Sequence, residues 1–178
     1  MIRIFIVISC FLGIQNTEPI ITWSDSYKLT WDDFKGGPKE NSTAAAITSS
    51  GIGFEYSIKQ SVFRVVSFKT KVLACFYPEK SWYKAQLANA HILEHEQLHY
   101  DITELYARKF RQQLSRVKPS KTLKSELNAL QESINKQLEN RQHEYDSDTD
   151  FSRSPEVQEQ WQELIKDELK KLAAFKSQ

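Results

Sequence analysis

The feature that most constrains this chain is a long segment, residues 81–117, that contains neither glycine nor proline. We expect this segment to form one continuous helix, with Ser81 as its N-cap. Near its middle stands an H-E-x-x-H motif that runs from His95 to His99. Histidines four positions apart lie one helical turn apart on one face, so both imidazoles can reach a single cation. The sequence therefore predicts a helix that binds a metal ion.

The acidic residue of the motif, Glu96, supplies the other half of this chemistry. Because it follows the first histidine, its carboxylate lies beside the metal rather than on it. There it can accept a proton from a water molecule whose pKa the metal has lowered toward about 7. This combination is typical of metal-assisted peptide hydrolysis. We therefore expect His95 and His99 to be zinc ligands and Glu96 to be the catalytic base.

A catalytic zinc site normally has three protein ligands and one open position. Asp101 and Glu104 follow the motif closely, but helical geometry turns both away from the face shared by His95 and His99. Glu104 is instead well placed to pair with Arg108, four residues further on. The third ligand is therefore expected from another segment.

The segment that follows a second helix, predicted over residues 120–143, is the expected source of this ligand. An antiparallel helix pair would bring that segment back toward the motif. It contains an acidic stretch, residues 145–150, which we expect to be a loop and which lacks the Gly and Glu that complete an EF-hand. The first candidate is Asp146 and the second is His143, followed by Asp148 and Asp150.

Three further side chains are candidates for supporting roles at the site. A hydroxyl from Tyr106 or Tyr145 could stabilise the oxyanion of a tetrahedral intermediate. His91 and His99 lie about 12 Å apart along a straight helix, so one ion cannot bind all three histidines. His91 is therefore expected to support the ligands from outside or to face solvent.

The pattern before the motif helix predicts an antiparallel sheet of three to five strands. Apolar and polar residues alternate through residues 20–77, including residues 29–34 and, most regularly, the half-buried strand at residues 52–58. Residues 63–76 are rich in Val and Phe and predict one long bent strand or two.

After the motif helix, Pro119 separates the second helix from the first, and Ser154-Pro155 predicts the start of a third, amphipathic helix. The expected fold class is α+β, with an N-terminal sheet followed by the motif helix and two further helices. The length suits a single domain over residues 20–178.

Residues 1–15 are typical of an export signal. Arg3 precedes an apolar run that is too short to span a bilayer. Residues 7–10 resemble a lipobox, which makes Cys10 a candidate site for a lipid anchor. We expect a secreted, periplasmic or cell-envelope protein without a transmembrane helix, in which Cys75 is a buried thiol without a disulfide partner.

The formal net charge of the 178 residues is +1. This balance argues against a nucleic-acid partner and gives no sign of a polybasic membrane patch.

The sequence also resembles a known bacterial family over nearly all of the expected mature chain. The residues that carry this resemblance are 29–36 (LTWDDFKG), 44–52 (AAAITSSGI), 80–82 (KSW), 95–108 (HEQLHYDITELYAR), Tyr145-Asp146 with Thr149, and Gln160-Trp161. The family is that of predicted secreted zinc-dependent proteases, catalogued as a domain of unknown function. The resemblance implies a zincin-like fold, with His95 and His99 as zinc ligands and Glu96 as the general base. Its members tend to carry a histidine two residues after the threonine, where this chain has Phe151.

Three functions are compatible with these observations. The first is a secreted zinc metallopeptidase that acts on a peptide or protein substrate, and the intact motif favours it. The second is a non-catalytic envelope protein of the same fold that binds a metal or a partner, which Phe151 and the unassigned third ligand favour. The third is an amidase that acts on cell-wall peptide with the same zinc chemistry.

Overall fold

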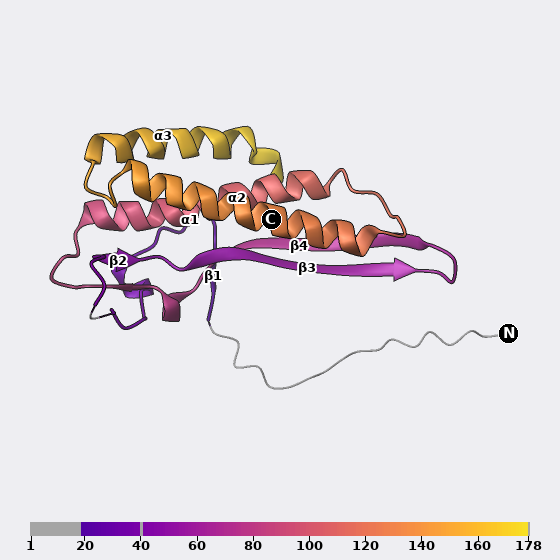
Figure 1. The fold of residues 1–178 in the computed structure, drawn as a ribbon, viewed down its shortest axis with the longest axis horizontal. Helices are drawn as coiled ribbons and strands as arrows, with labels where there is room; N and C mark the ends of the chain where they lie inside the picture. The colour runs from indigo at the N-terminus through magenta and orange to yellow at the C-terminus, as the bar shows by residue number, and fades with distance from the viewer. Residues whose placement is uncertain (1–18, 40, 178) are drawn as a thin grey trace.

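The computed structural model describes residues 19–39 and 41–177, which form two layers (Figure 1). One layer is a small antiparallel sheet, drawn out into a long hairpin. The other consists of three helices that lie on one side of the sheet (Figure 1). The α+β class and the order of sheet before helices are therefore as expected. The predicted export signal and Cys10 lie outside the described residues.

The main sheet has three antiparallel strands in the order β1-β4-β3. β3 (Ser50–Gln60) and β4 (Val65–Phe76) form the long hairpin, and β1 (Ile21–Thr22) pairs with the end of β4. The alternation predicted for residues 52–58 is confirmed, because the phenyl ring of Phe54 packs at 4.7 Å from that of Phe110 on the helical layer. Residues 65–76 form one strand, which is one of the two predicted forms.

A second sheet, of two strands, shows that the prediction of Ser81 as a helix N-cap is wrong. β2 (Ala46–Ile47) pairs antiparallel with β5 (Trp82–Tyr83), which occupies the expected first turn. The buried hydroxyl of Ser81 donates a hydrogen bond to the Tyr77 carbonyl at 2.9 Å and accepts one from the Ser49 amide at 2.9 Å. Pairing with a distant strand thus overrides the local helical pattern.

The motif helix, α1 (Ala90–Leu114), begins eight residues later than predicted, because its N-cap is Asn89 and not Ser81. The Asn89 side chain caps it by accepting a hydrogen bond from the Ile92 amide at 2.9 Å. Residues 29–34 also differ from expectation, because they contain a short 3-10 helix, Trp31–Asp33, instead of a strand. The Asp33 carboxylate accepts from the Thr30 amide at 2.7 Å and so closes this turn.

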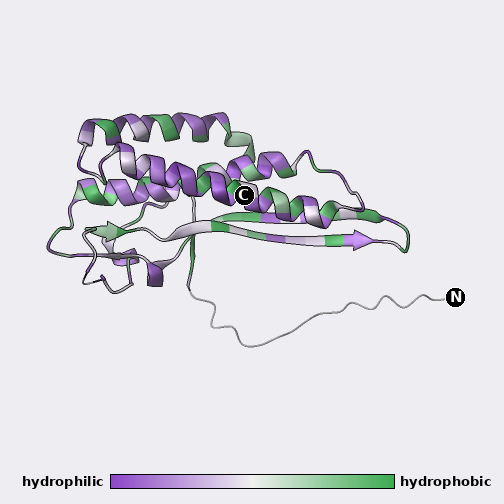
Figure 2. Cartoon of the chain, in the orientation of Figure 1, coloured by the Kyte–Doolittle hydropathy of each residue, from purple (hydrophilic) through white to green (hydrophobic). Residues whose placement is uncertain are grey.

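The two remaining helices are α2 (Leu123–Asp148) and α3 (Pro155–Lys171). α3 starts at the predicted Ser154-Pro155 pair. α2, however, continues through residues 145–148, so the expected acidic loop is largely the last turn of a helix. Hydrophobic and hydrophilic residues are interleaved along the helices and the long hairpin (Figure 2), and the buried apolar side chains of both layers form one core cluster.

A buried ion-pair cluster holds α1 near its middle. Glu104 is fully buried, and its carboxylate accepts from Arg108 Nε at 2.8 Å and from Arg111 Nη1 at 3.1 Å. Arg108 also donates to the Leu169 carbonyl of α3 at 2.7 Å, and Arg111 donates to the Val72 carbonyl of β4 at 2.9 Å. The expected pairing of Glu104 with Arg108 is therefore confirmed, and the cluster joins both layers.

The described residues also bear on the expectations for Cys75 and for a transmembrane helix. Cys75 is a buried free thiol, as predicted. None of the helices in the described part is both long and apolar enough to cross a bilayer.

Candidate metal centre

Three potential ligand atoms converge where α1 meets the last turn of α2. His95 and His99 project from adjacent turns of α1, and Asp146 comes from the helix that packs beside it. The Nε2 atoms of the two histidines are 3.2 Å apart. Asp146 Oδ1 lies 3.2 Å from Nε2 of His95 and 2.9 Å from Nε2 of His99. The structure thus brings together the two motif histidines and the first candidate for the third ligand.

The geometry of these three atoms fits one face of a tetrahedral zinc site. With bonds of about 2.0–2.2 Å to each ligand, tetrahedral zinc separates its ligand atoms by roughly 3.4 Å. The observed separations of 2.9–3.2 Å are only a few tenths of an ångström shorter, a difference that small side-chain rotations can supply. Two imidazoles and one carboxylate are also a ligand set that occurs in catalytic zinc sites.

The electrostatics of the site suit a cation. Burial opposes ionisation of Asp146, but hydrogen bonds from His95 and His99 outweigh it and hold the pKa of its carboxyl well below the usual value. Burial also opposes the charged form of His99, yet the hydrogen bond to Asp146 and the charge of Glu96 raise the pKa of this imidazole. Without metal, a proton on His99 therefore balances the negative charge of the Asp146 carboxylate. A metal ion bound between the two side chains could balance the same charge.

Gln142, one turn before Asp146 on α2, fixes the orientation of the His99 ring. Its Nε2 donates to the His99 carbonyl at 2.8 Å, which leaves its Oε1 to accept a hydrogen bond from His99 Nδ1. With the proton on Nδ1, the Nε2 lone pair of His99 points into the site, as metal binding requires. By contrast, His95 Nδ1 is buried and has no hydrogen-bond partner among the described residues.

The ring of Tyr145 positions His95 by stacking. The two ring centroids are 4.5 Å apart with an interplanar angle of 24°, and the Tyr145 ring also packs at 5.3 Å against that of Trp161 in α3. The Tyr145 hydroxyl is buried and has no hydrogen-bond partner among the described residues. Tyr145 therefore contributes its ring to the site, and the structure does not place its hydroxyl in the cavity where it could stabilise an oxyanion.

Glu96 shares a cavity of about 600 Å³ with the three ligand residues. It is only 5% exposed, and its backbone carbonyl accepts a hydrogen bond from the Thr48 hydroxyl at 3.2 Å. Residues 42–48, which include β2, form one wall of the cavity, and residues 151–153 form another. A larger cavity of about 900 Å³ lies on the far side of α1, beside α3, and contains none of the three ligand residues.

The structure does not bring His91, His143 or Tyr106 to the ligand atoms. His91 Nε2 hydrogen-bonds the Ser152 carbonyl at 2.7 Å, so it joins α1 to the turn before α3. His143 lies at the cavity rim with its side chain 76% exposed, 3.9 Å from Glu139. Tyr106 is buried two turns beyond His99, under the Lys109 ammonium.

The other acidic candidates also have structural partners instead. Asp148 accepts a hydrogen bond from Trp161 Nε1 at 3.2 Å, and Asp150 pairs with Arg153 at 3.0 Å. Asp101 accepts from Trp23 Nε1 at 2.6 Å, on the side of α1 away from the ligands. Asp148 and Asp101 therefore tie elements together, and Asp150 forms a local pair within the turn, so none of the three enters the site.

The turn after α2 places Phe151 at the cavity of the candidate metal centre, a position that the H-E-x-x-H motif could not indicate. Asp150, Phe151 and Ser152 all have positive φ angles, of 48°, 53° and 69°, which is an uncommon conformation for residues other than glycine. The Phe151 amide donates to the Asp146 carbonyl at 2.8 Å, so this turn closes over the end of α2. Phe151 lines the cavity while remaining 62% exposed.

Gln142 was also not anticipated from the sequence. Its signal would have been its spacing, because a residue four positions before Asp146 lies on the same face of α2. Both residues therefore face α1. Gln142 orients the candidate ligand His99, and Asp146 is itself a candidate ligand.

Fold and site together define an α+β protein whose long central helix carries a candidate His–His–Asp metal centre. Residues 32–152 match the family described as bacterial protein of unknown function (DUF922), and the chain belongs to this family. The match extends from the 3-10 helix through β2 to β5, α1 and α2 to the left-handed turn, and it leaves out β1 and α3. No curated protein and no solved structure matches the chain.

Proposed function

We propose that this protein is a zinc-dependent metallopeptidase of zincin-like fold that hydrolyses peptide bonds in a peptide or protein substrate. The observation that carries the proposal is the convergence of His95 Nε2, His99 Nε2 and Asp146 Oδ1 within 2.9–3.2 Å, beside Glu96 in one cavity. A structural zinc site would be closed by a fourth protein ligand. Here the three ligands border an open cavity, which favours a site that admits substrate.

Each residue of the centre has a distinct role in this proposal. His95, His99 and Asp146 would hold zinc, which supplies polarisation of the scissile carbonyl and activation of water. Glu96 accepts the proton from the attacking water and then passes it to the leaving amine. Its low exposure removes competing solvent from the carboxylate, which strengthens its interaction with a proton donor. Gln142 and Tyr145 keep the two imidazoles in place.

The substrate would lie in an extended conformation along β2. Within the described residues β2 pairs only with β5, so its other edge is open for main-chain hydrogen bonds. Residues 42–48 border the cavity that contains Glu96, which would place a peptide bond of such a substrate near the carboxylate. Phe151, which lines the same cavity, offers an apolar contact to a substrate side chain.

The expected site of action is outside the cytoplasm, in the cell envelope or the medium. This part of the proposal rests on residues 1–15, with Cys10 as the candidate for lipid attachment.

Metal content and hydrolysis, measured on paired variants, test the proposal. Elemental analysis should find about one zinc ion per chain, lost in His95→Ala but retained in His143→Ala, whose histidine is exposed at the cavity rim. Glu96→Gln should keep zinc and lose hydrolysis of a peptide library, whereas Glu94→Gln, at an exposed neighbouring position, should keep both.

The same measurements separate the proposal from its alternatives. Zinc bound without turnover in the wild-type protein would support the non-catalytic metal-binding or partner-binding protein. Hydrolysis of cell-wall peptides but not of the library would indicate the amidase. Absence of zinc from the wild-type protein after incubation with the metal would refute the metal centre itself.

A further inference from the structure

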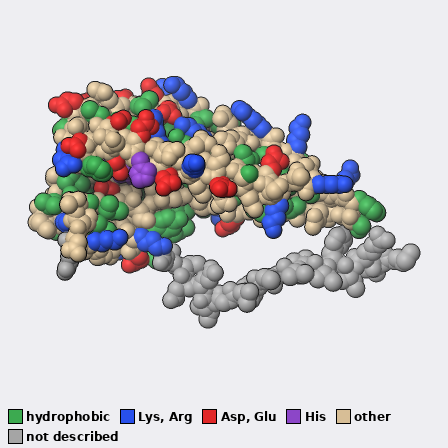
Figure 3. Space-filling model, in the orientation of Figure 1, with side chains coloured by type: hydrophobic (Ala, Val, Ile, Leu, Met, Phe, Trp, Pro, Cys, Tyr) green, Lys and Arg blue, Asp and Glu red, His purple; other side chains and the backbone are tan. Residues whose placement is uncertain are grey.

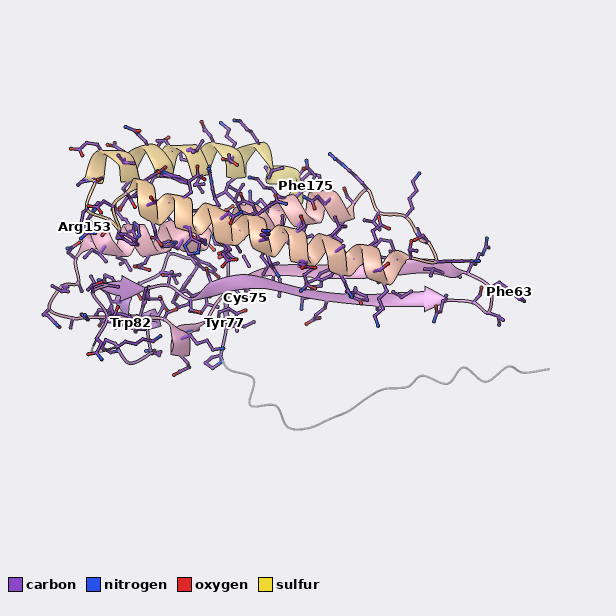
Figure 4. The ribbon with its side chains drawn as sticks, in the orientation of Figure 1. Phe63, Cys75, Tyr77, Trp82, Arg153 and Phe175 are labelled. Carbon is purple, nitrogen blue, oxygen red and sulfur yellow. The ribbon has the colours of Figure 1, made fainter. Side chains whose placement is uncertain are left out.

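The tip of the β3–β4 hairpin exposes apolar side chains that nothing in the described structure covers. Val62 and Phe63 form the tip, with exposed fractions of 85% and 87%, and Val66 is 47% exposed. Figure 1 shows the hairpin projecting beyond the ends of the helices, and Phe63 lies at its far end, pointing away from the protein (Figure 4). Exposing an apolar pair at such a tip is unfavourable in water, which suggests a surface that receives it.

Positive charge is concentrated around this tip. Residues 56–70 contain three basic residues and residues 112–125 contain four, while neither segment contains an Asp or a Glu. The seven are Lys59, Arg64, Lys69, Arg116, Lys118, Lys121 and Lys124, and all are exposed. None of them forms an ion pair with another described residue. On the face that Figure 3 draws, Lys and Arg side chains gather toward the hairpin end of the molecule.

The two basic segments form one continuous surface. Arg64 and Val66 of the hairpin line a small hollow together with Pro119 and Lys121 of the loop between α1 and α2. The net charge of +1 for the whole chain conceals this surface, because the compensating acidic residues lie elsewhere. The net charge of the whole chain therefore gives no sign of this local excess of positive charge.

We propose that this end of the protein docks on an anionic lipid membrane, with Val62 and Phe63 inserted among the lipids and the surrounding cations against the headgroups. An apolar wedge accounts for the exposed pair, and lipid phosphates complement the seven cations. An acidic polymer would satisfy the cations but would leave Val62 and Phe63 in water.

Docking at the tip sets the distance of the candidate metal centre from the bilayer. Ser50, at the other end of β3, lines the cavity of that centre. The strand has 11 residues, so at about 3.3 Å per residue the cavity lies roughly 36 Å from the tip. The docking does not depend on the metal or on hydrolysis.

Vesicle binding tests the proposal on the full chain. Vesicles of phosphatidylcholine with added phosphatidylglycerol should bind the protein more tightly than phosphatidylcholine alone, and added salt should weaken this binding. Phe63→Ser should weaken binding about tenfold or more, while Phe151→Ser, the same change at another exposed phenylalanine, should not. Neutralising Arg64 and Lys121 to Gln should weaken it about 25-fold, because each surface cation contributes roughly fivefold, whereas Lys35→Gln with Lys39→Gln, near β2, should have little effect.

Hydrogen exchange gives a local measurement that any binding by residues 1–18 cannot imitate. Anionic vesicles should slow amide exchange in residues 61–66 and leave residues 150–153 unchanged. The proposal is overturned if residues 61–66 gain no protection, or if Phe63→Ser and Phe151→Ser bind equally. It is also overturned if the protein binds polyphosphate but not anionic vesicles.

Discussion

Replacing Gln142 with leucine should weaken zinc binding without unfolding the protein. In the wild-type site, Gln142 Oε1 accepts the hydrogen bond from His99 Nδ1, and its Nε2 donates to the His99 carbonyl at 2.8 Å. The leucine side chain fills a similar volume but offers neither group. The imidazole then loses the acceptor that fixes its tautomer and raises its basicity toward the metal.

The expected loss of zinc affinity follows from the role of residues that hydrogen-bond a metal ligand without binding the metal themselves. Their removal typically costs 10–100-fold in metal affinity, equivalent to about 1.4–2.8 kcal/mol of binding free energy. The unfolding free energy should fall by a further 1–3 kcal/mol or so, because the partly buried Nδ1–H group of His99 loses its partner. Gln142→Glu should retain zinc binding near the wild-type level, since a carboxylate supplies the same acceptor.

Competition with a chromogenic chelator at fixed pH measures the zinc dissociation constant of each variant. Gln137→Leu is the matched control, because Gln137 is an exposed glutamine on the same helix whose amide contacts only Ser133. Circular dichroism confirms that each protein is folded. An unchanged zinc affinity in folded Gln142→Leu would show that this glutamine does not orient His99 for a metal.

Three further predictions concern the residues around the centre. Without metal, the raised pKa of His99 makes its pairing with Asp146 fully stabilising below pH 6.5, and this contribution is lost as pH rises through the raised value. The lowered pKa of Asp146 makes the contribution of its carboxylate complete above about pH 3.8, and that contribution is lost only as pH falls further, toward the lowered value. Melting temperatures in chelator should therefore lose the His99 contribution above neutral pH, whereas in zinc they should rise with pH as the metal displaces the proton; parallel profiles would contradict the shared site. Tyr145→Phe should leave activity intact and unfolding free energy unchanged or higher by about 1 kcal/mol, because it removes a buried hydroxyl without a partner; a loss of turnover with zinc retained would restore the oxyanion role. Glu104→Gln should lower the unfolding free energy by about 3–5 kcal/mol in denaturant titrations, since it leaves the buried Arg108 with only the exposed carboxylate of Asp25 at 3.9 Å, and a change below 1 kcal/mol or so would refute the pairing with Glu104.

The elements with strong local periodicity could be predicted from the sequence. The alternation of β3 and the Ser154-Pro155 start of α3 are encoded by neighbouring residues, and both appear where expected. The start of α1 could not be predicted in this way. Residues 82–83 pair with β2, more than thirty positions away, and local helix propensity carries no information about that partner.

In the candidate site, too, some features follow from the local sequence and others depend on tertiary contacts. Two histidines on one turn follow from the period of a helix, but the residue opposite them depends on how α2 packs. The Asp- and Ser-rich residues 145–150 are weak helix formers, which favoured a loop. Packing of Tyr145 between His95 and Trp161 extends the helix through Asp148 instead. Asp146 was therefore a ranked candidate on the sequence, and tertiary contacts decide that it meets both imidazoles while His143 faces solvent.

The candidate ligands come from helices that are otherwise joined only by packing and polar contacts. His99 and Asp146 are 47 positions apart, and Cys75 is the single cysteine in the described part of the chain. A bound ion would therefore act as a removable cross-link, closing a long loop as a disulfide does in many exported proteins. Under the proposed zinc binding, loss of the ion should loosen the end of α2 and the turn after it first, so metal supply would influence the lifetime of the protein.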